Sequence, residues 1–309
     1  MPKNNPIILI ADKKYLDYVP ANLYQISLYA PSNQVVYLVT DFVPSDLVIQ
    51  TLENKFINLT LIFKSVELND HIGDISIPRK THVSRAALLK FFLPRILAEE
   101  DCVVYLDIDT VICKPILELL NFQPRLSIAA TEELGVNAFH RKAARAYFNS
   151  GVMVMSLEKL RALDLEATVK KMVANKEYMK TYVDQEIFNV LFSNSVEYLP
   201  QGFNVFICNM KFSNFGSFIK SPTIVHFVGL DKPWTYPKKT KYSKLWLESF
   251  SKGLGEYPNA EQRRILKSRR GNLNLAQIFI LLIFAISRFF RGLKRMLPSS
   301  IKGLLKEFF

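Results

Sequence analysis

Strands alternate with helices along most of the chain, and this order predicts an α/β domain with a mainly parallel central sheet. Two observations support the prediction. Short apolar runs rich in β-branched residues recur through the first 230 residues, and segments with helical apolar spacing separate several of them. The chain of 309 residues is 49% hydrophobic and 22% charged, as expected for a globular protein. No GxGxxG or GxxxxGK[ST] motif follows any strand, which argues against the common dinucleotide and P-loop sites.

These apolar patterns predict seven strands and four helices along the chain. The predicted strands cover residues 7–11, 34–40, 59–63, 103–106, 127–130, 151–155 and 223–228. The predicted helices cover residues 20–29, a stretch that begins at 44–46, residues 84–97 and residues 184–192. Pro94 is expected to kink or end the third helix. In an open parallel sheet, ligands bind beyond the carboxyl ends of strands, so the polar residues that follow each strand are the candidates for a site.

The positive charge is concentrated at the carboxyl end of the chain. The formal net charge is +12, yet residues 261–309 alone hold 11 basic residues against Glu261 and Glu307. The remainder is nearly balanced, so an anionic partner is expected to touch only the tail. Apolar residues recur there at helical spacing with Arg and Lys opposite, which indicates a basic amphipathic segment on an anionic membrane surface. A packed helical subdomain is the alternative, and a nucleic-acid partner is not expected.

The amino terminus and the cysteines indicate a location inside the cell. No apolar segment long enough for a signal peptide precedes the first strand. Three cysteines cannot form a complete disulfide framework, so a reducing compartment is expected. The apolar segment 275–286 spans only ~18 Å as a helix, which is too short to cross a bilayer. These features predict a cytoplasmic protein that is peripheral on the inner face of the plasma membrane.

Two carboxylates directly follow the predicted strand at 103–106. Asp107 and Asp109 stand one residue apart in the segment VVYLDIDT. Side chains at i and i+2 project to the same side of an extended chain, so both can reach one hard divalent cation. Oxygen ligands suit Mg²⁺ or Mn²⁺, which often bridge to substrate phosphates. The same pattern also occurs in solvated turns, but its place at a strand end favours a metal site.

A second group of polar residues interrupts the late apolar segment IVHFVGLDKPW. A single histidine inside a strand, such as His226, is more often a buried core residue, although a neutral imidazole also binds metals. Lys232 follows beyond Gly229, a residue that lets the backbone approach a ligand closely. A lysine there provides a point charge for a phosphate.

Together these motifs resemble glycosyltransferase family 8, the retaining nucleotide-sugar transferases with a GT-A fold. Further segments agree with the family in order and spacing over residues 7–234. They are KFFLPRIL at 90–97, FNSGV at 148–152, Asp184-Gln185, Leu199-Pro200 and Phe203-Asn204. The resemblance implies a GT-A catalytic domain, which we assign to residues 1–260, followed by the membrane-associating tail at 261–309.

The resemblance also implies roles for individual residues. Asp107, Asp109 and His226 would hold Mn²⁺ or Mg²⁺. The UDP-sugar donor would be bound by Ala11, Asp12, Tyr15, Lys90, Ile108, Gly229 and Lys232, with Tyr15 stacking on the uracil. Asn149, Asp184 and Gln185 would line the sugar pocket as the catalytic residues. Packing at a helix start is the plain alternative for Tyr15, and an N-cap is the alternative for Asp184.

The sequence departs from the family pattern at three places. Lys14 stands where the family usually has Asn, and Lys90 stands where it usually has Arg, so a bidentate contact becomes a point charge. The family often has Asp after the strand near residue 130, where this chain has Glu132 and Glu133. Either glutamate could be the sugar-binding carboxylate.

The resemblance implies a metal-dependent enzyme that moves galactose or glucose from a UDP-sugar to a lipid-linked or lipopolysaccharide-type glycan. Two alternatives remain open at this point. One is a glycogenin-like transferase that glucosylates protein or glucan. The other is a catalytically silent scaffold that binds a sugar nucleotide, against which the intact Asp107, Asp109 and His226 argue.

Overall fold

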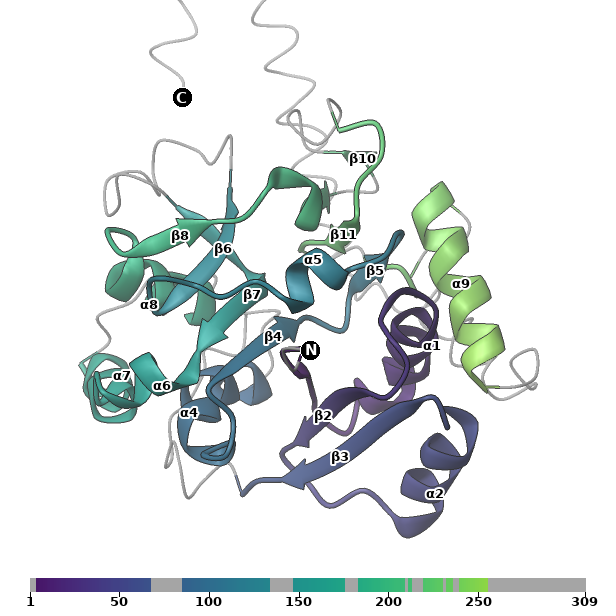
Figure 1. The fold of residues 1–309 in the computed structure, drawn as a ribbon, viewed down its shortest axis with the longest axis horizontal. Coiled ribbons are helices and arrows are strands. Elements are labelled where there is room, and N and C mark those ends of the chain that lie inside the picture. The colour runs from purple at the N-terminus through teal and green to yellow at the C-terminus, as the bar shows by residue number, and fades with distance from the viewer. Residues whose placement is uncertain are drawn as a thin grey trace, which may run out of the picture. The chain divides into compact units, whose positions relative to one another are not determined.

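A computed structural model of the chain describes residues 4–67, 85–133, 147–175, 183–208, 211–212, 219–229, 232–235 and 239–254 (Figure 1). All the predicted site residues lie within these ranges. The predicted domain boundary at residue 260 and the tail at 261–309 lie outside the described residues. Within the described ranges, no helix is both long enough and apolar enough to cross a bilayer.

The centre of the fold is a seven-stranded sheet with the order β3-β2-β1-β4-β7-β6-β8. Strand β7 runs antiparallel to β4 and β6, and all other neighbouring strands are parallel. The prediction of a mainly parallel α/β sheet is therefore confirmed. The strands are β1 (Ile7–Ala11), β2 (Gln34–Thr40), β3 (Leu59–Ser65), β4 (Cys102–Leu106), β6 (Ile128–Glu132), β7 (Phe148–Ser156) and β8 (Val196–Tyr198).

A second sheet of four short strands was not predicted. Its order is β10-β9-β11-β5, with β5 (Thr110–Ile112), β9 (Val205–Cys208), β10 (Lys211–Phe212) and β11 (Ile224–Phe227). Strands of two to four residues are too short to show a clear apolar period, and only the strand predicted at 223–228 was visible in the sequence. The antiparallel pairing of β5 with β11 places Thr110 opposite His226.

The helices flank the central sheet. They are η1 (Leu16–Tyr18), α1 (Val19–Tyr29), α2 (Asp46–Lys55), η2 (Arg85–Phe92), α4 (Leu93–Ile96), α5 (Leu117–Leu120), α6 (Leu157–Arg161), α7 (Leu165–Ala174), α8 (Val183–Phe192), η4 (Gln201–Phe203) and α9 (Lys241–Leu254). The prediction of one helix at 84–97 was wrong in detail, because a 3-10 helix precedes a single α-turn. Pro94 lies in the first turn of α4, where its missing N–H costs nothing, so it begins this helix instead of ending one.

Both faces of the central sheet are covered, which explains why β1 is apolar at every position. Ile8 and Ile10 belong to the core cluster formed with η2, α6 and α8. Ile7 and Leu9 point to the opposite face and are also fully buried. A strand that is buried on both faces has a continuous apolar sequence, so polar residues follow it only where the strand ends.

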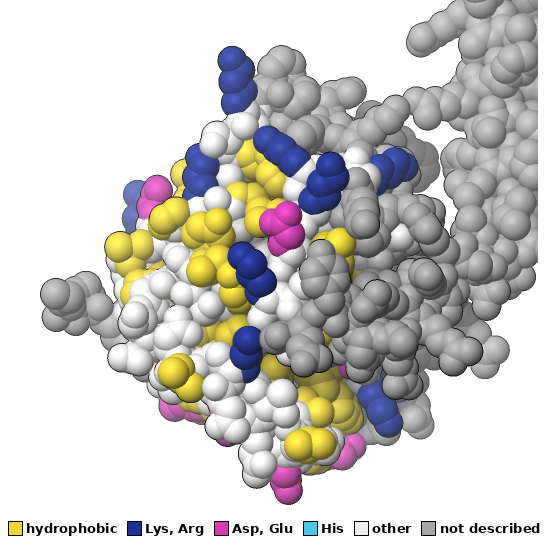
Figure 2. All heavy atoms as spheres, turned by 90° about the vertical axis from the view of Figure 1, so that its right-hand side faces the viewer, with side chains coloured by type: hydrophobic (Ala, Val, Ile, Leu, Met, Phe, Trp, Pro, Cys, Tyr) yellow, Lys and Arg dark blue, Asp and Glu magenta, His cyan; other side chains and the backbone are white. Residues whose placement is uncertain are grey.

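Helix α9 packs beside α1 in Figure 1. The buried amide of Gln25 joins three elements there: its Nε2 donates to Ser249 Oγ (3.1 Å) and its Oε1 accepts from Ile112 N (2.9 Å). This contact ties α1 and α9 to β5, the strand that follows the Asp-X-Asp motif. Figure 2 shows the side of the molecule that lies at the right in Figure 1, and Lys and Arg side chains gather in its upper part.

Candidate active site

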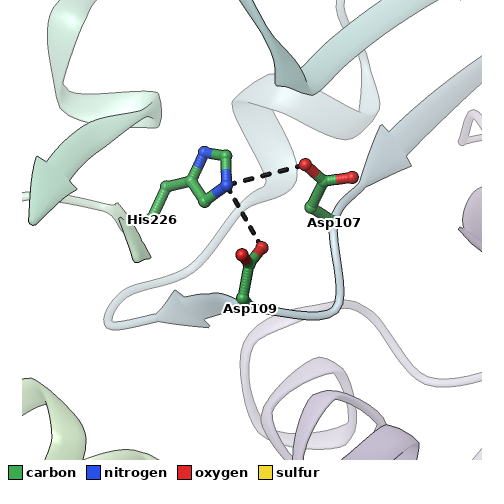
Figure 3. Close-up of side chains that lie close together, drawn as sticks. All are labelled: Asp107, Asp109 and His226. Carbon is green, nitrogen blue, oxygen red and sulfur yellow. Dashed lines mark ion pairs between the residues drawn. The ribbon is translucent and has the colours of Figure 1, made fainter. Parts of the chain in front are cut away.

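Asp107 and Asp109 lie in the connection between β4 and β5, at the carboxyl end of β4. His226 reaches them from β11 in the second sheet (Figure 3). Its Nε2 is 3.5 Å from Asp107 Oδ2 and 3.1 Å from Asp109 Oδ1. One ligand atom from each of the three residues lies within 4.8 Å of the others. The three residues expected from the sequence to bind metal are therefore brought together.

Backbone hydrogen bonds fix the turn that carries the two aspartates. Thr110 donates to the carbonyl of Asp107 from both its N–H (3.1 Å) and its Oγ1 (2.7 Å). The Asp107 N–H donates to the carbonyl of Gly151 (2.8 Å), and the Phe227 N–H donates to the carbonyl of Asp109 (3.1 Å). The turn is thus bonded to both sheets, and its two carboxylates have little freedom to separate.

Two buried lysines balance the carboxylates. Lys90 Nζ, on η2, is 3.3 Å from Asp107 Oδ1 and 2.6 Å from Asp184 Oδ2. Lys232 forms an ion pair with Asp109. Burial alone would lower the pKa of each lysine, but the facing carboxylates outweigh it and raise the pKa of both. Burial likewise opposes ionisation of Asp109, yet Lys232 and His226 hold the pKa of that carboxyl well below its ordinary value.

Tyr105 and Ser150 complete the surroundings of Lys90. The Tyr105 hydroxyl donates to Asp107 Oδ1 (2.5 Å), and Lys90 Nζ lies 4.5 Å from the centre of the Tyr105 ring. Burial, reinforced by Asp107, raises the pKa of Tyr105 well above its usual range, so the hydroxyl remains a donor. Ser150 Oγ donates to Asp184 Oδ2 (3.1 Å), and the Ser150 carbonyl accepts from Lys90 (3.2 Å).

A chain of amide side chains links the sugar-pocket candidates. Gln185 Nε2 donates to Glu133 Oε2 (2.9 Å), and Gln185 Oε1 accepts from Asn149 Nδ2 (2.7 Å). Asn149 Oδ1 accepts from the Gly151 N–H (2.9 Å). Because a backbone N–H and a carboxylate lie at the two ends, both amide orientations are fixed. Burial raises the pKa of Glu133, although the bond from Gln185 opposes this.

The same chain sets the tautomer of His226. Its Nδ1 faces two amide oxygens, Asn149 Oδ1 at 3.1 Å and Asn204 Oδ1 at 3.2 Å. Asn204 Nδ2 donates to Asn149 Oδ1 (2.9 Å), which leaves the Asn204 oxygen for the imidazole. Two acceptors place a hydrogen on Nδ1, so Nε2 is the ring nitrogen that can give its lone pair to a cation held by the two carboxylates. Two carboxylates and one imidazole nitrogen fit a divalent cation such as Mn²⁺.

The residues expected to bind the nucleotide lie at the end of β1. Ala11 is its last residue, and Asp12 Oδ1 accepts from the N–H groups of Lys14 and Tyr15 (both 2.9 Å). The Tyr15 ring meets Trp234 edge to face, with centroids 5.7 Å apart. Trp234 therefore joins the segment after Lys232 to this end of the sheet.

The remaining predicted donor residues flank the metal candidates. Ile108 is buried between the two aspartates. Gly229 follows β11 with a φ of 85°, a left-handed conformation that favours glycine. Of the two glutamates left open by the sequence, Glu133 bonds Gln185, whereas Glu132 lies in β6 and its carbonyl accepts from Gln201 (3.0 Å).

Four residues of the site were missed as site residues in the sequence: Tyr105, Ser150, Gly151 and Asn204. Tyr105 had a signal, because it stands two residues before Asp107 and so shares its side of the strand. Asn204 lies in a segment that resembles the family, but its contact with His226 depends on the pairing of β9 with β11. Gly151 lies in the FNSGV segment that resembles the family, but the need for a residue without a side chain follows only from the close approach of His226 and Asp107.

A mainly parallel α/β sheet with an Asp-X-Asp carboxylate pair at a strand end defines a transferase domain of the GT-A class. The sequence model described as "Glycosyl transferase family 8" matches residues 6–238, which is well over half of the chain. The chain belongs to this family. The membership confirms the prediction of a retaining glycosyltransferase domain.

Curated relatives from bacteria agree with this family. "Glycosyltransferase GlyF" of Streptococcus pneumoniae serotype 4 is 22% identical over 251 residues, covering 78% of this chain and 60% of the relative. "Lipopolysaccharide 1,2-glucosyltransferase" of Escherichia coli K12 is 28% identical over 187 residues, covering 54% of this chain and 55% of the relative. The match to each thus spans little more than half of the relative's length.

Solved structures share the fold. The galactosyltransferase LgtC, in complex with donor and acceptor sugar analogs, superposes with a TM-score of 0.67 at 21% identity, over 80% of this chain and 95% of LgtC. The bifunctional glycosyltransferase WbbM superposes with a TM-score of 0.66 at 21% identity, over 87% of this chain and 52% of WbbM. At these identities the likeness concerns the fold, and it confirms the predicted GT-A class.

We predict that Gly151→Ala separates His226 from Asp107 and abolishes transferase activity. A Cβ at residue 151 would lie 2.1 Å from His226 Cε1 and 2.7 Å from Asp107 Oδ2, closer than atoms can approach. The imidazole must move, at a cost of about 1–3 kcal/mol of stability. Unfolding in urea and donor hydrolysis measure the two effects.

Gly202→Ala is the matched control, because the nearest atom to a Cβ there is Thr223 Oγ1 at 4.0 Å. It should retain activity. Full activity of Gly151→Ala would show that the close approach of Gly151 to His226 is not needed for the site.

Proposed function

We propose that the domain is a metal-dependent retaining glycosyltransferase that moves galactose or glucose from a UDP-sugar to a lipid-linked or lipopolysaccharide-type glycan. The convergence of Asp107, Asp109 and His226 at a strand end, with Lys232 beside them, carries this proposal. Family membership supports the transferase class. The printed name of the Escherichia coli relative, a lipopolysaccharide glucosyltransferase, supports the acceptor class.

The donor binds across the carboxyl ends of β1 and β4. Tyr15, held by Asp12, stacks on the uracil, and Ala11 borders the base. Lys232 exchanges Asp109 for a phosphate oxygen, since both partners are anionic acceptors for its ammonium group. Gly229 lets the following segment close over the diphosphate.

Asp107, Asp109 and His226 would hold Mn²⁺ or Mg²⁺, which would supply positive charge to offset the charge that grows on the diphosphate as the sugar–phosphate bond breaks. The protein residues prepare that site before the donor arrives. The amide chain holds the His226 ring with Nε2 toward the carboxylates, and the buried ammonium group of Lys90 lies 3.3 Å from Asp107 Oδ1.

The sugar lies against the chain that runs from Glu133 through Gln185 to Asn149. We assign the sugar-binding carboxylate to Glu133, because its bond to Gln185 places it in line with the other pocket residues. Asp184 is held by Lys90 and Ser150, so its carboxyl oxygens can accept hydrogen bonds from hydroxyl groups of the sugar. Galactose and glucose differ in the orientation of one hydroxyl group. Hydrogen bonds from these residues to that hydroxyl would distinguish the two sugars.

Retention of configuration follows from attack on the same face of the sugar that the phosphate leaves. Gln185 is a poor nucleophile, and its amide is engaged on both sides by Asn149 and Glu133. Asp184 is engaged by Lys90 and Ser150. The bond from the anomeric carbon to the phosphate oxygen breaks, the acceptor oxygen bonds to that carbon, and the departing phosphate takes the acceptor's proton.

The transfer takes place at the inner face of a plasma membrane. The 11 basic residues of 261–309 alternate with apolar residues, which supports peripheral binding to anionic lipids. A membrane acceptor is then delivered to the same surface that holds the enzyme, which raises its effective concentration.

Replacing both aspartates tests the metal site. D107N/D109N should lower Mn²⁺-dependent hydrolysis of UDP-galactose and UDP-glucose by at least about 100-fold, because both charged ligands are lost and only the neutral imidazole remains. Asp101→Asn removes an exposed carboxylate that pairs with Arg161 at 3.3 Å, and it should leave the rate unchanged. Unchanged Mn²⁺-dependent turnover in the double variant rules out the proposed metal site.

Asn204→Ala tests how the imidazole is positioned. Loss of one acceptor at Nδ1 should weaken Mn²⁺ binding about 10- to 100-fold, as loss of an outer partner of a ligating histidine typically does. The control is Asn189→Ala, a buried amide that bonds the backbone of Phe148 through its oxygen and its nitrogen and donates to the carbonyl of Gln185 (all 2.8 Å). Unlike Asn204, its amide does not face the imidazole of His226 in the described hydrogen bonds. The control should lose stability and keep its Mn²⁺ affinity in an EPR titration. Equal affinities in the two variants would contradict the positioning role.

Removal of the tail tests the membrane proposal. A chain that ends at residue 260 should still hydrolyse the donor but lose binding to anionic vesicles, since each basic residue near such a surface contributes ~1 kcal/mol. Co-sedimentation at low and high salt measures the binding, and the electrostatic part weakens with salt. Undiminished sedimentation of the shortened chain would assign membrane binding to residues 1–260.

A further inference from the structure

A second pocket lies at the far end of the ladder that joins β5 to β11. Its volume is about 220 Å³, and Cys113, Lys114, Ser221 and Tyr242 form part of its wall. The ladder ends at this pocket, where the Cys113 N–H donates to the carbonyl of Thr223 (2.8 Å). The pocket therefore lies between the ends of two strands and the first turn of α9.

Three lysines converge on this pocket: Lys114, Lys220 and Lys241. The residues that line it include no acidic side chain. Within the part of the chain that the structure describes, none of the three forms an ion pair, whereas Lys90 and Lys232 of the candidate active site both face carboxylates. Lys114 Nζ donates to the carbonyl of Ser221 (2.6 Å), which holds its charge at the pocket wall.

The position of Lys241 adds to the positive potential. It is the first residue of α9, and the N-terminus of a helix is a site where the macrodipole favours anions and disfavours cations. The same positive charge affects the pKa of the Cys113 thiol. Burial raises its pKa to about 12, while Lys241 and Lys114 act in the opposite direction. Among the described residues that line the pocket, no carboxylate offsets these positive charges.

The pocket is separate from the candidate active site. Asp109 and Cys113 are four residues apart along β5 and its flanks, a distance of ~13 Å for an extended chain. The ladder pairs Thr110 with His226 near the active site and Ile112 with Ile224 near the pocket. A ligand in the pocket shares no residue with the metal ligands, yet the same short ladder carries both.

We propose that the pocket formed by Lys114, Lys220 and Lys241 binds the phosphate group of a phosphate-bearing molecule. Three lysines that line one pocket match the charge and the several acceptor oxygens of a phosphate mono- or diester. The molecule is a lipid headgroup or a phosphorylated soluble compound. Figure 2 shows several Lys and Arg side chains gathered in the upper part of the face that it displays. The proposal does not depend on the transferase chemistry.

A titration with inorganic phosphate tests the pocket directly. The readout is the backbone amide resonances of Cys113, Ser221 and Tyr242, because these are local and do not report phosphate bound near Lys232. In the wild-type chain they should shift along a saturable curve. In K114Q/K220Q/K241Q the apparent affinity should fall at least tenfold, while amides elsewhere keep their positions.

The control variant is K55Q/K171Q/K244Q, which removes the same charge from exposed lysines on α2, α7 and α9 that do not line the pocket. Its phosphate affinity should stay within twofold of the wild type. An equal loss in both variants would show diffuse attraction to a basic protein, and the absence of saturable shifts in the wild type would show no site. Either result overturns the proposal.

Vesicles identify the source of the phosphate. Both variants keep the basic tail, so any difference in their co-sedimentation with phosphatidylcholine vesicles containing phosphatidic acid arises at the pocket. Weaker sedimentation of the pocket variant than of the control assigns the site to a lipid headgroup. Equal sedimentation, together with the tenfold loss for inorganic phosphate, assigns it to a soluble phosphorylated compound.

Discussion

The close approach of two carboxylates at Asp107 and Asp109 is the constraint on which the rest of the site depends. Like charges held by one turn repel each other, and burial makes the repulsion stronger. The fold offsets it with Lys90 on one side and Lys232 on the other, each buried and facing its carboxylate. The arrangement holds two carboxylate side chains at a strand end, each paired with a buried lysine, which offsets the cost of placing charged groups there.

The second sheet adds a third metal-binding side chain to the pair of aspartates. Strand β5 leaves the turn, pairs with β11 and so places His226 opposite the carboxylates. The amide oxygens of Asn149 and Asn204 then contact Nδ1 of His226, which leaves Nε2 facing the two carboxylates. Gly151 makes the approach possible, since any side chain there would occupy the place of the imidazole. The position of His226 Nε2 therefore depends on three features: the pairing of β5 with β11, the orientation of the two amides, and the absence of a side chain at Gly151.

The sequence predicts the central sheet well because its strands are long and apolar; the predicted bounds of β1 and β2 match the structure at both ends. It also predicts which residues meet at the strand ends, since that follows from strand order and from the family's motifs. It could not predict the second sheet, whose strands are too short for a period to emerge. Contacts such as Glu133 with Gln185 or Asn204 with His226 depend on tertiary pairing, so no spacing in the sequence reveals them.

Anomalous diffraction from crystals grown with Mn²⁺ and UDP tests the central claim, that the two carboxylates and the imidazole form one divalent-metal site. The account predicts a single strong peak at the manganese edge bounded by Asp107, Asp109 and His226 Nε2. It further predicts that Lys232 leaves Asp109 for the diphosphate. A strongest peak elsewhere, or Lys232 still paired with Asp109 beside a bound diphosphate, would contradict the account.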